Sequence, residues 1–309
     1  MTIEILKIFL PIVIVFLLGM AGKKWNWFDA SGSAAFRSVI GHFMLPAVVF
    51  DAFLHVNFSG DILLIGGTVY IWMVLALGLG FLLRRRFFPQ IELLPFFVTL
   101  GEIGMLGYSL IRLLFGAEGA EQMAICDLGN TGATFTLIIP LLRMQGKDAK
   151  ERKAIIKDIL TTPTLIALLS GIILGLSGVG KIIDESAIGP VYQAIIDLIT
   201  GPTTVLILLS VGYDLYFDSN VLRDVFKVTL LRVLIMGVLG TLSSLLIFSF
   251  VPFNKVLLCA LILCIILPCS YCVPIYAPPH TDSRFSATMI SVSTLLGLIL
   301  YIGLTVFAL

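Results

Sequence analysis

The stretch QGKDAKERKAIIK, residues 145–157, decides how this chain is organised, because it is a basic polar segment between two long apolar halves. Five of its thirteen residues are lysine or arginine. The sequence therefore predicts three parts: a first helical half at residues 1–144, a basic linker at residues 145–158 and a second helical half at residues 159–309.

The composition on both sides of this linker is that of a membrane protein. Of 309 residues, 59% are hydrophobic and 13% are charged, whereas about 25% of the residues of an average soluble chain are charged. The net charge of +1 gives no general attraction to nucleic acid. We therefore expect a multi-pass protein of the cell membrane, with the lipid bilayer around it and no nucleic-acid partner.

Ten apolar segments are candidates to cross the bilayer, since a helix needs roughly 20 apolar residues to span about 30 Å of hydrocarbon. They lie at about residues 5–22, 35–54, 62–83, 93–115, 122–142, 159–180, 190–217, 225–250, 256–278 and 285–309. The predicted fold is an all-α integral membrane protein with ten transmembrane helices.

The basic residues give this predicted fold a direction. Fifteen follow odd-numbered segments, and three, Lys7, Lys181 and Lys255, lie on the other side. The positive-inside rule then places the loops after odd segments in the cytoplasm and both termini on the extracytoplasmic side. Five helices in each half also force the halves into opposite orientations, which predicts an inverted-topology repeat.

The fourth segment of each half is interrupted. Residues 101–107, GEIGMLG, hold three glycines, which weaken a helix. Residues 267–274, LPCSYCVP, hold Pro268 and Pro274, which each lack a backbone donor. A pair of interrupted helices in corresponding positions predicts broken, crossing helices 4 and 9 with a midplane binding site between them. Unwound backbone near residues 104–107 is expected to face unwound backbone near residues 270–274. The other interpretation is two ordinary kinked helices.

Polar side chains inside the apolar segments are the candidate functional residues. Glu102 is the clearest, because an ionisable group near the bilayer centre costs about 2.5–3.5 kcal/mol on insertion scales, and a helix break beside it would expose an N-terminus that can hold an anion. Asp127 shares a helix face with Asn130 and Thr131, which lie three and four residues later. The other interpretation is a packing contact between helices. Asp214 lies near a segment end and could instead reach water, and His42 could be a hydrogen-bonded packing residue. The residues predicted to bind the solute or couple its movement are Glu102, Gly104, Gly107, Tyr108, Asp127, Asn130, Thr131, His42, Pro46, Ser270, Tyr271, Cys272, Pro274 and Asp214.

Metal and redox cofactors are not expected. Cys269 and Cys272 form a C-x-x-C pair, but no second pair and no histidine cluster accompany it. The cysteines are interpreted as small packing residues.

In their order along the chain, several short motifs resemble those of the auxin efflux carrier family of secondary transporters, within the bile/arsenite/riboflavin transporter superfamily. The motifs lie at residues 10–24, 45–50, 101–107, 209–212, 267–268 and 293–296. The resemblance implies crossing helices 4 and 9 around the substrate, and elevator-type movement of a small organic anion such as a dicarboxylate or an auxin-like acid. The expected partners are this solute, the lipid bilayer and a second copy of the chain in a homodimer.

Two residues depart from the pattern of that family. Glu102 stands where the family has asparagine, and Ser109 stands where it has proline. An ionised Glu102 would repel a carboxylate that asparagine could bind. Burial disfavours the charged form of a carboxyl group. Glu102 is therefore predicted either to couple transport to protons or to signal a neutral or cationic solute.

Two other functions remain open at this point. One is a ligand sensor built on a transporter scaffold. The other is an intramembrane aspartyl protease that uses Asp127 and Asp214. The residues around these two aspartates differ from the motifs that such proteases carry. A transporter that is not an enzyme is the preferred prediction.

Overall fold

The computed structural model describes residues 2–56, 60–144, 154, 157–158, 160–278 and 281–308. Most of the predicted linker at residues 145–158 lies outside these ranges. The described chain is helical, as expected where the bilayer offers backbone groups no water. Its elements in chain order are α1 (Thr2–Lys24), α2 (Ala30–Val39), η1 (Ile40–Met44), α3 (Leu45–His55), α4 (Gly60–Phe87), α5 (Leu94–Thr99), η2 (Ile103–Gly107), α6 (Tyr108–Ala133), η3 (Thr134–Ile138), α7 (Ile139–Arg143), α9 (Pro163–Leu176), α10 (Val179–Asp184), α11 (Gly189–Thr200), α12 (Thr203–Asp214), α13 (Leu222–Phe250), α14 (Lys255–Ile266), α15 (Cys272–Tyr276) and α16 (Ser283–Ala308).

Several of these helical segments have the dimensions of membrane spans. Six in the described chain are long and apolar enough to cross a bilayer: Ala30–His55, Gly60–Phe87, Tyr108–Arg143, Gly189–Asp214, Leu222–Phe250 and Ser283–Ala308. The helices α9 and α14 are apolar but shorter. The prediction of an all-helical membrane protein agrees with this architecture, and the count of ten spans stays a prediction.

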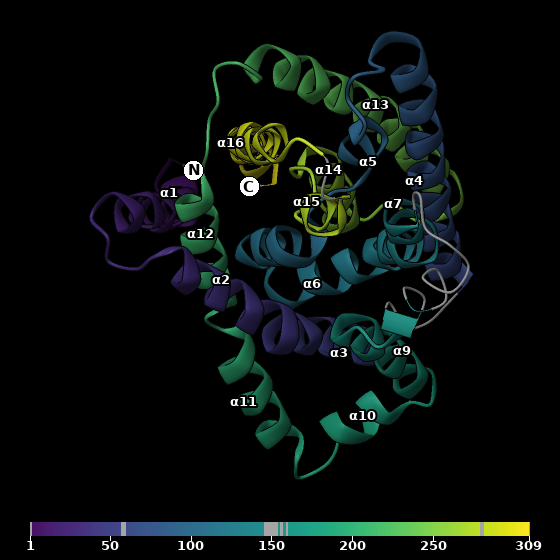
Figure 1. The fold of residues 1–309 in the computed structure, drawn as a ribbon. Helices are drawn as coiled ribbons and strands as arrows, with labels where there is room; N and C mark the ends of the chain where they lie inside the picture. The colour runs from purple at the N-terminus through teal and green to yellow at the C-terminus, as the bar shows by residue number, and fades with distance from the viewer. Residues whose placement is uncertain are drawn as a thin grey trace.

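The helices pack as two groups, which Figure 1 shows side by side. Group A consists of α1, α2, η1, α3, α9, α10, α11 and α12, along the left and lower part of the view. Group B consists of the remaining helices, with α6, α14 and α16 near its centre and α4 and α13 at its outer side. Each group therefore combines helices from before and after the basic linker. The groups meet where α3 contacts α6, where α12 contacts η2 and where α1 contacts α16.

Small residues allow the closest packing within group A. A Cβ atom added at Gly212 of α12 would collide with the carbonyl oxygen of Phe16 in α1. A Cβ atom at Gly19 of α1 would collide with the carbonyl oxygen of Leu209 in α12. Such small-residue contacts let membrane helices approach through their backbones.

A proline reshapes the helix that joins α2 to α3. Pro46 has no N–H to donate to the carbonyl of His42, four residues earlier. The preceding turn widens into the π-helical η1, in which the Leu45 N–H bonds to the Ile40 carbonyl. Local widening of this kind keeps the helix continuous past a missing donor.

One glycine separates the predicted fourth and fifth segments. Within α6, Gly116 has φ 60° and ψ −137°, so the chain turns sharply there although helix flanks it on both sides. This region of backbone conformation is close to one that only glycine adopts without strain. The sharp turn thus depends on the absence of a side chain at this position.

Replacing Gly116 by alanine should lower the free energy of unfolding by about 1–3 kcal/mol through backbone strain. An added Cβ atom meets nothing within 4 Å, so no steric contact contributes. Thermal unfolding of the purified protein in detergent measures the effect. Gly237→Ala in α13, where an added Cβ atom also meets open space, is the matched control and should be neutral or slightly stabilising. A Gly116→Ala variant as stable as that control would contradict the prediction.

Candidate functional site

The two interrupted segments meet through their unwound backbones. The Glu102 N–H donates to the Pro268 carbonyl at 3.0 Å, and the Ser270 N–H donates to the Leu100 carbonyl at 3.1 Å. Between these bonds, Gly101 and Cys269 form an antiparallel bridge. The expected meeting of two broken helices is therefore present, and the two continuous helices of the alternative interpretation are absent at these positions.

The break in the first segment lies earlier than the sequence predicted. The expected unwound region was residues 104–107, but these residues belong to the π-helical η2, and the chain leaves helical geometry at residues 100–102. The glycines instead allow close packing. A Cβ atom at Gly104 would lie 3.2 Å from the Leu45 side chain, and one at Gly107 would lie 3.1 Å from Leu267. In the second segment Pro268 explains the break, since the residue before a proline favours extended geometry and α14 ends at Ile266.

Glu102 is buried at this crossing and binds the segment opposite. Its Oε2 accepts hydrogen bonds from the Ser270 hydroxyl at 2.9 Å and from the Tyr271 N–H at 2.8 Å. The Cys272 N–H in turn donates to the Ser270 hydroxyl at 3.2 Å. The structure thus brings together four of the residues predicted from sequence. The Glu102 carboxyl group therefore occupies the backbone N–H of Tyr271, the residue that directly precedes α15.

Arg232 of α13 completes the crossing, and the sequence did not single it out as a site residue. Its Nη1 donates to the Phe97 carbonyl at 2.8 Å, and its Nη2 donates to the carbonyls of Leu267 at 3.0 Å and Pro268 at 3.4 Å. These carbonyls lie at the C-terminal ends of α5 and α14, where helix dipoles concentrate negative charge. The guanidinium is buried and stabilises both helix ends at once.

A cavity of about 460 Å³ reaches the crossing from one side. We call it the Arg37 cavity; Arg37 and Asp214 line it from group A, and Tyr271, Pro274 and Ile290 line it from group B. Arg37 and Asp214 form an ion pair across α2 and α12. Three predicted site residues, Asp214, Tyr271 and Pro274, therefore share one cavity.

The Ser33 hydroxyl joins the ion pair at the wall of this cavity. It donates to Asp214 Oδ1 at 3.1 Å and accepts from Arg37 Nη1 at 3.0 Å. The pair is only partly exposed, with 35% of the Arg37 side chain and 30% of the Asp214 side chain accessible. Both charges thus remain available to the cavity.

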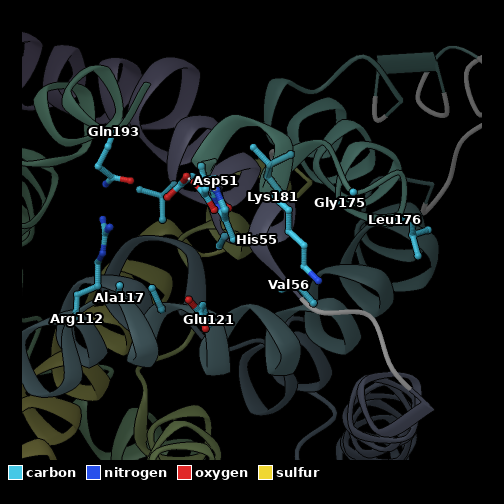
Figure 2. Close-up of a pocket in the computed structure, with 16 residues that line it drawn as sticks. Asp51, His55, Val56, Arg112, Ala117, Glu121, Gly175, Leu176, Lys181 and Gln193 are labelled. Carbon is cyan, nitrogen blue, oxygen red and sulfur yellow. Dashed lines mark hydrogen bonds and ion pairs between the residues drawn. The ribbon is translucent and has the colours of Figure 1, made fainter. Parts of the chain in front are cut away.

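A second cavity, of about 580 Å³, lies at the other end of the span Ala30–His55, which α2, η1 and α3 form together (Figure 2). We call it the His55 cavity; Asp51, His55 and Lys181 line it from group A, and Arg112 and Glu121 line it from group B. At 1.5 Å per residue, Arg37 and His55 lie about 27 Å apart along their shared span. The two cavities are therefore at opposite ends of the boundary between the groups.

Charged side chains of group A are linked to one another inside the His55 cavity. His55 Nδ1 lies 3.2 Å from Asp51 Oδ1, and His55 Nε2 lies 3.4 Å from Asp184 Oδ1. The Tyr192 hydroxyl donates to Asp51 Oδ1 at 2.9 Å. These contacts connect α3 with α10 and α11, so they stabilise group A. None of these contacts crosses the boundary to group B.

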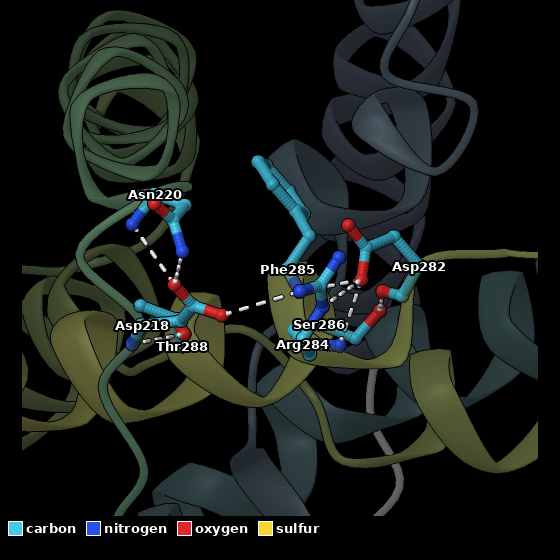
Figure 3. A network of polar contacts seen from close by, with 7 residues as sticks. All are labelled: Asp218, Asn220, Asp282, Arg284, Phe285, Ser286 and Thr288. Carbon is cyan, nitrogen blue, oxygen red and sulfur yellow. Dashed lines mark hydrogen bonds and ion pairs between the residues drawn. The ribbon is translucent and has the colours of Figure 1, made fainter.

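A second network joins the groups beside the Arg37 cavity (Figure 3). Asp218, which follows α12, accepts at Oδ1 from the backbone and side-chain nitrogens of Asn220, each at 2.9 Å. Its Oδ2 lies 3.8 Å from Arg284 Nη1, and its N–H donates to the Thr288 hydroxyl at 3.2 Å. The connection between α12 and α13 is thereby held against the first turns of α16.

Asp127 forms a separate buried cluster. Its Oδ1 accepts from Asn130 Nδ2 at 3.1 Å and from the Thr131 hydroxyl at 2.8 Å, and its Oδ2 accepts from the Tyr108 hydroxyl at 3.3 Å. The predicted polar face of this helix is therefore real, and Tyr108 belongs to it. Asp127 lines neither the Arg37 cavity nor the His55 cavity, so its contacts favour a role in holding Tyr108 at the start of α6.

Asp127→Leu should lower the free energy of unfolding by about 2–5 kcal/mol, because three buried donors lose their acceptor at about 1–3 kcal/mol each, while removal of the buried carboxyl group offsets part of this loss. Asp127→Asn should cost less than about 1 kcal/mol, since its amide oxygen keeps two donors and its NH₂ can donate to Tyr108. Chemical or thermal unfolding of the two variants compares them directly. Equal stability of the two variants would contradict this assignment.

His42 lies apart from these sites. Its side chain is exposed, and its Nδ1 lies 2.8 Å from the Ser38 carbonyl one turn earlier. It lines neither of the two cavities, which agrees with the packing interpretation rather than with solute binding. In the part of the chain that the structure describes, no three metal-ligating side chains are grouped together.

Comparison with known proteins relates this geometry to transport. An uncharacterised transporter of Methanocaldococcus jannaschii is 24% identical over 220 residues, which cover 68% of this chain and 68% of the relative. The chain has relatives among transporters. A second uncharacterised transporter, from Methanothermobacter thermautotrophicus, is 25% identical over 233 residues, covering 73% of this chain and 74% of that protein. No family model matches the chain, so the auxin efflux carrier family remains a resemblance.

Proposed function

We propose that this chain is a secondary transporter that moves a small organic acid across the membrane by alternating access, with a proton carried by Glu102. One observation carries the proposal. Two cavities enter the boundary between the same two helix groups from opposite ends, and the crossing around Glu102 lies beside one of them. Movement of group B against group A would open each cavity in turn, which is an elevator-type mechanism.

The arrangement of the helices supports this proposal. Group A combines the predicted segments 1, 2, 6 and 7, and group B combines the other six. Each group therefore holds corresponding members of the two predicted inverted repeats, as expected for transporters of that kind. With both termini on the extracytoplasmic side, the Arg37 cavity would face the cytoplasm and the His55 cavity the outside. We further propose that the protein works as a homodimer in the cell membrane.

Counterflow in proteoliposomes tests the proposal. Vesicles containing the purified protein are loaded with a mixture of organic acids, amines and neutral metabolites, and exchange is followed by mass spectrometry. At least one solute should exchange faster than in protein-free vesicles, and a pH gradient should alter its rate. Binding of solutes without any exchange would support the alternative function, a ligand sensor.

The protease alternative finds less support in the structure. Asp127 binds Tyr108, Asn130 and Thr131, whereas Asp214 pairs with Arg37 at the wall of the Arg37 cavity. The two carboxyl groups share no described cavity that could hold a peptide bond between them. A peptide cleavage assay with the purified protein provides the direct comparison.

A further inference from the structure

The Arg37 cavity presents both signs of charge to whatever enters it. Arg37 uses only Nη1 in its bonds to Asp214 and Ser33. Within the described residues, its Nε and Nη2 atoms make no hydrogen bond or ion pair. A guanidinium has five donors in a planar fork that matches a carboxylate. The Arg37 cavity therefore offers an unused binding edge for a carboxylate, while Asp214 keeps a negative charge beside it.

Two buried hydroxyl groups lie near this cavity, one on Tyr271, which lines it, and one on Thr294, a turn further along α16 than the lining residue Ile290. The Tyr271 hydroxyl and the Thr294 hydroxyl are both buried, and neither has a hydrogen-bond partner with acceptable geometry among the described residues. A buried polar group without a partner costs about 1–3 kcal/mol. Tyr271 lines this cavity together with Asp214, and its N–H donates to Glu102. A polar group of a solute could satisfy the Tyr271 hydroxyl once this side chain turns toward the cavity.

We infer that the solute of this transporter is a zwitterion of amino-acid size, with a carboxylate that binds Arg37 and a protonated amine that binds beside Tyr271, between Glu102 and Asp214. This inference rests on the proposed function and names its substrate class. Apolar atoms of Pro274, Ala287 and Ile290 would surround the rest of the solute.

The balance of charge distinguishes this class from the neighbouring ones. The cavity wall contributes one cation, Arg37, and one carboxyl group, Asp214; at the crossing Glu102 adds a second carboxyl group, while the guanidinium of Arg232 already donates to backbone carbonyls. A dicarboxylate would bring two more negative groups to a site where Arg37 is the cation that lines the cavity. A simple amine would leave the free edge of Arg37 unmatched. A zwitterion satisfies both signs and carries no net charge, which lowers the cost of taking it into a low-dielectric site.

A matched set of ligands tests the inference. Valine, leucine and phenylalanine are each compared with the analogue that lacks the amine and with the analogue that lacks the carboxylate, by thermal shift and by calorimetry on the full chain in nanodiscs. At least one amino acid should raise the unfolding temperature by mass action, and both of its truncated analogues should bind roughly tenfold or more weakly. Equal or tighter binding of the analogue without an amine would overturn the inference.

Two variants test whether the carboxylate of the amino acid binds Arg37. Arg37→Lys keeps the charge but loses the fork, so it should weaken amino-acid binding about tenfold. Arg86→Gln, an exposed arginine outside the cavity, is the control and should bind as the wild type does. Unchanged binding by Arg37→Lys would overturn the placement of the carboxylate. Failure of every amino acid to bind, in protein that still exchanges another solute, would overturn the zwitterion and leave transport intact. Loss of all exchange would instead count against the proposed function.

Discussion

Replacing Arg232 by methionine should destabilise the protein more than any other single change considered for it. The guanidinium donates to carbonyls at the ends of α5 and α14, and it is buried. Methionine fills much of the same volume but donates nothing. Each buried acceptor left without a donor costs about 1–3 kcal/mol, so the free energy of unfolding should fall by about 2–6 kcal/mol. Both halves of the crossing should loosen together, because one side chain serves both.

Thermal unfolding in detergent measures the loss, and Arg223→Met provides the control, since Arg223 lies exposed on the first turn of the same helix. Arg232→Lys should fall between methionine and wild type. Lysine keeps the charge, but its compact ammonium lacks the planar fork that reaches carbonyls in two directions. If the methionine variant unfolds within 2 °C of the control, a difference of roughly 1 kcal/mol, Arg232 does not hold the crossing.

The role of Arg232 shows what the sequence can and cannot reveal. An arginine inside the apolar run at residues 225–250 is costly in a membrane and must find partners, so its presence was a signal. Its partners were not visible, because Phe97 lies 135 positions away and offers only a backbone carbonyl. Backbone acceptors carry no sequence signature. The same holds for the Tyr271 N–H that binds Glu102.

Breaks in helices were more predictable than contacts between them. Pro268 ends α14 by local chemistry alone, and the glycines at residues 101–107 correctly marked the other interrupted segment. Their effect was displaced by a few residues, because glycine tolerates helical geometry and the packing against Leu45 and Leu267 keeps η2 wound. His42 lines neither of the two cavities. Its turn offers a carbonyl at Ser38, so a local bond satisfies the side chain.

The cavities could not be inferred from either half of the sequence by itself. Arg37 and Asp214 are 177 positions apart, and they meet because α2 and α12 pack in the same group. Tyr271 approaches them from the other group. Periodicity and composition describe each helix, but they do not determine which faces of the helices meet. The boundary between two helix groups is a property of the packed molecule.

Replacing Glu102 by glutamine should remove the pH dependence of solute binding and transport. In the wild type, an ionised Glu102 accepts from Ser270 and Tyr271 and would also attract the amine of a zwitterionic solute. Protonation removes that charge, so the affinity should rise as the pH rises through the titration of this group. Linkage to one proton allows a slope of up to about tenfold per pH unit. Glutamine has no proton to exchange, and its affinity should be low and nearly constant from pH 5 to 8.

The fold should survive this change, because the amide oxygen of glutamine can still accept from the Tyr271 N–H and replace the bond that the carboxylate makes. Calorimetric titration at four pH values gives the slope, and solute exchange in proteoliposomes gives the same dependence for transport. Glu118→Gln, an exposed carboxyl group on α6 outside both cavities, should keep the wild-type slope. A Glu102→Gln variant that keeps this slope would remove Glu102 from proton coupling, because glutamine has no proton to exchange in this pH range. A variant that loses the slope but keeps exchanging solute would instead separate coupling from the movement of the helix groups.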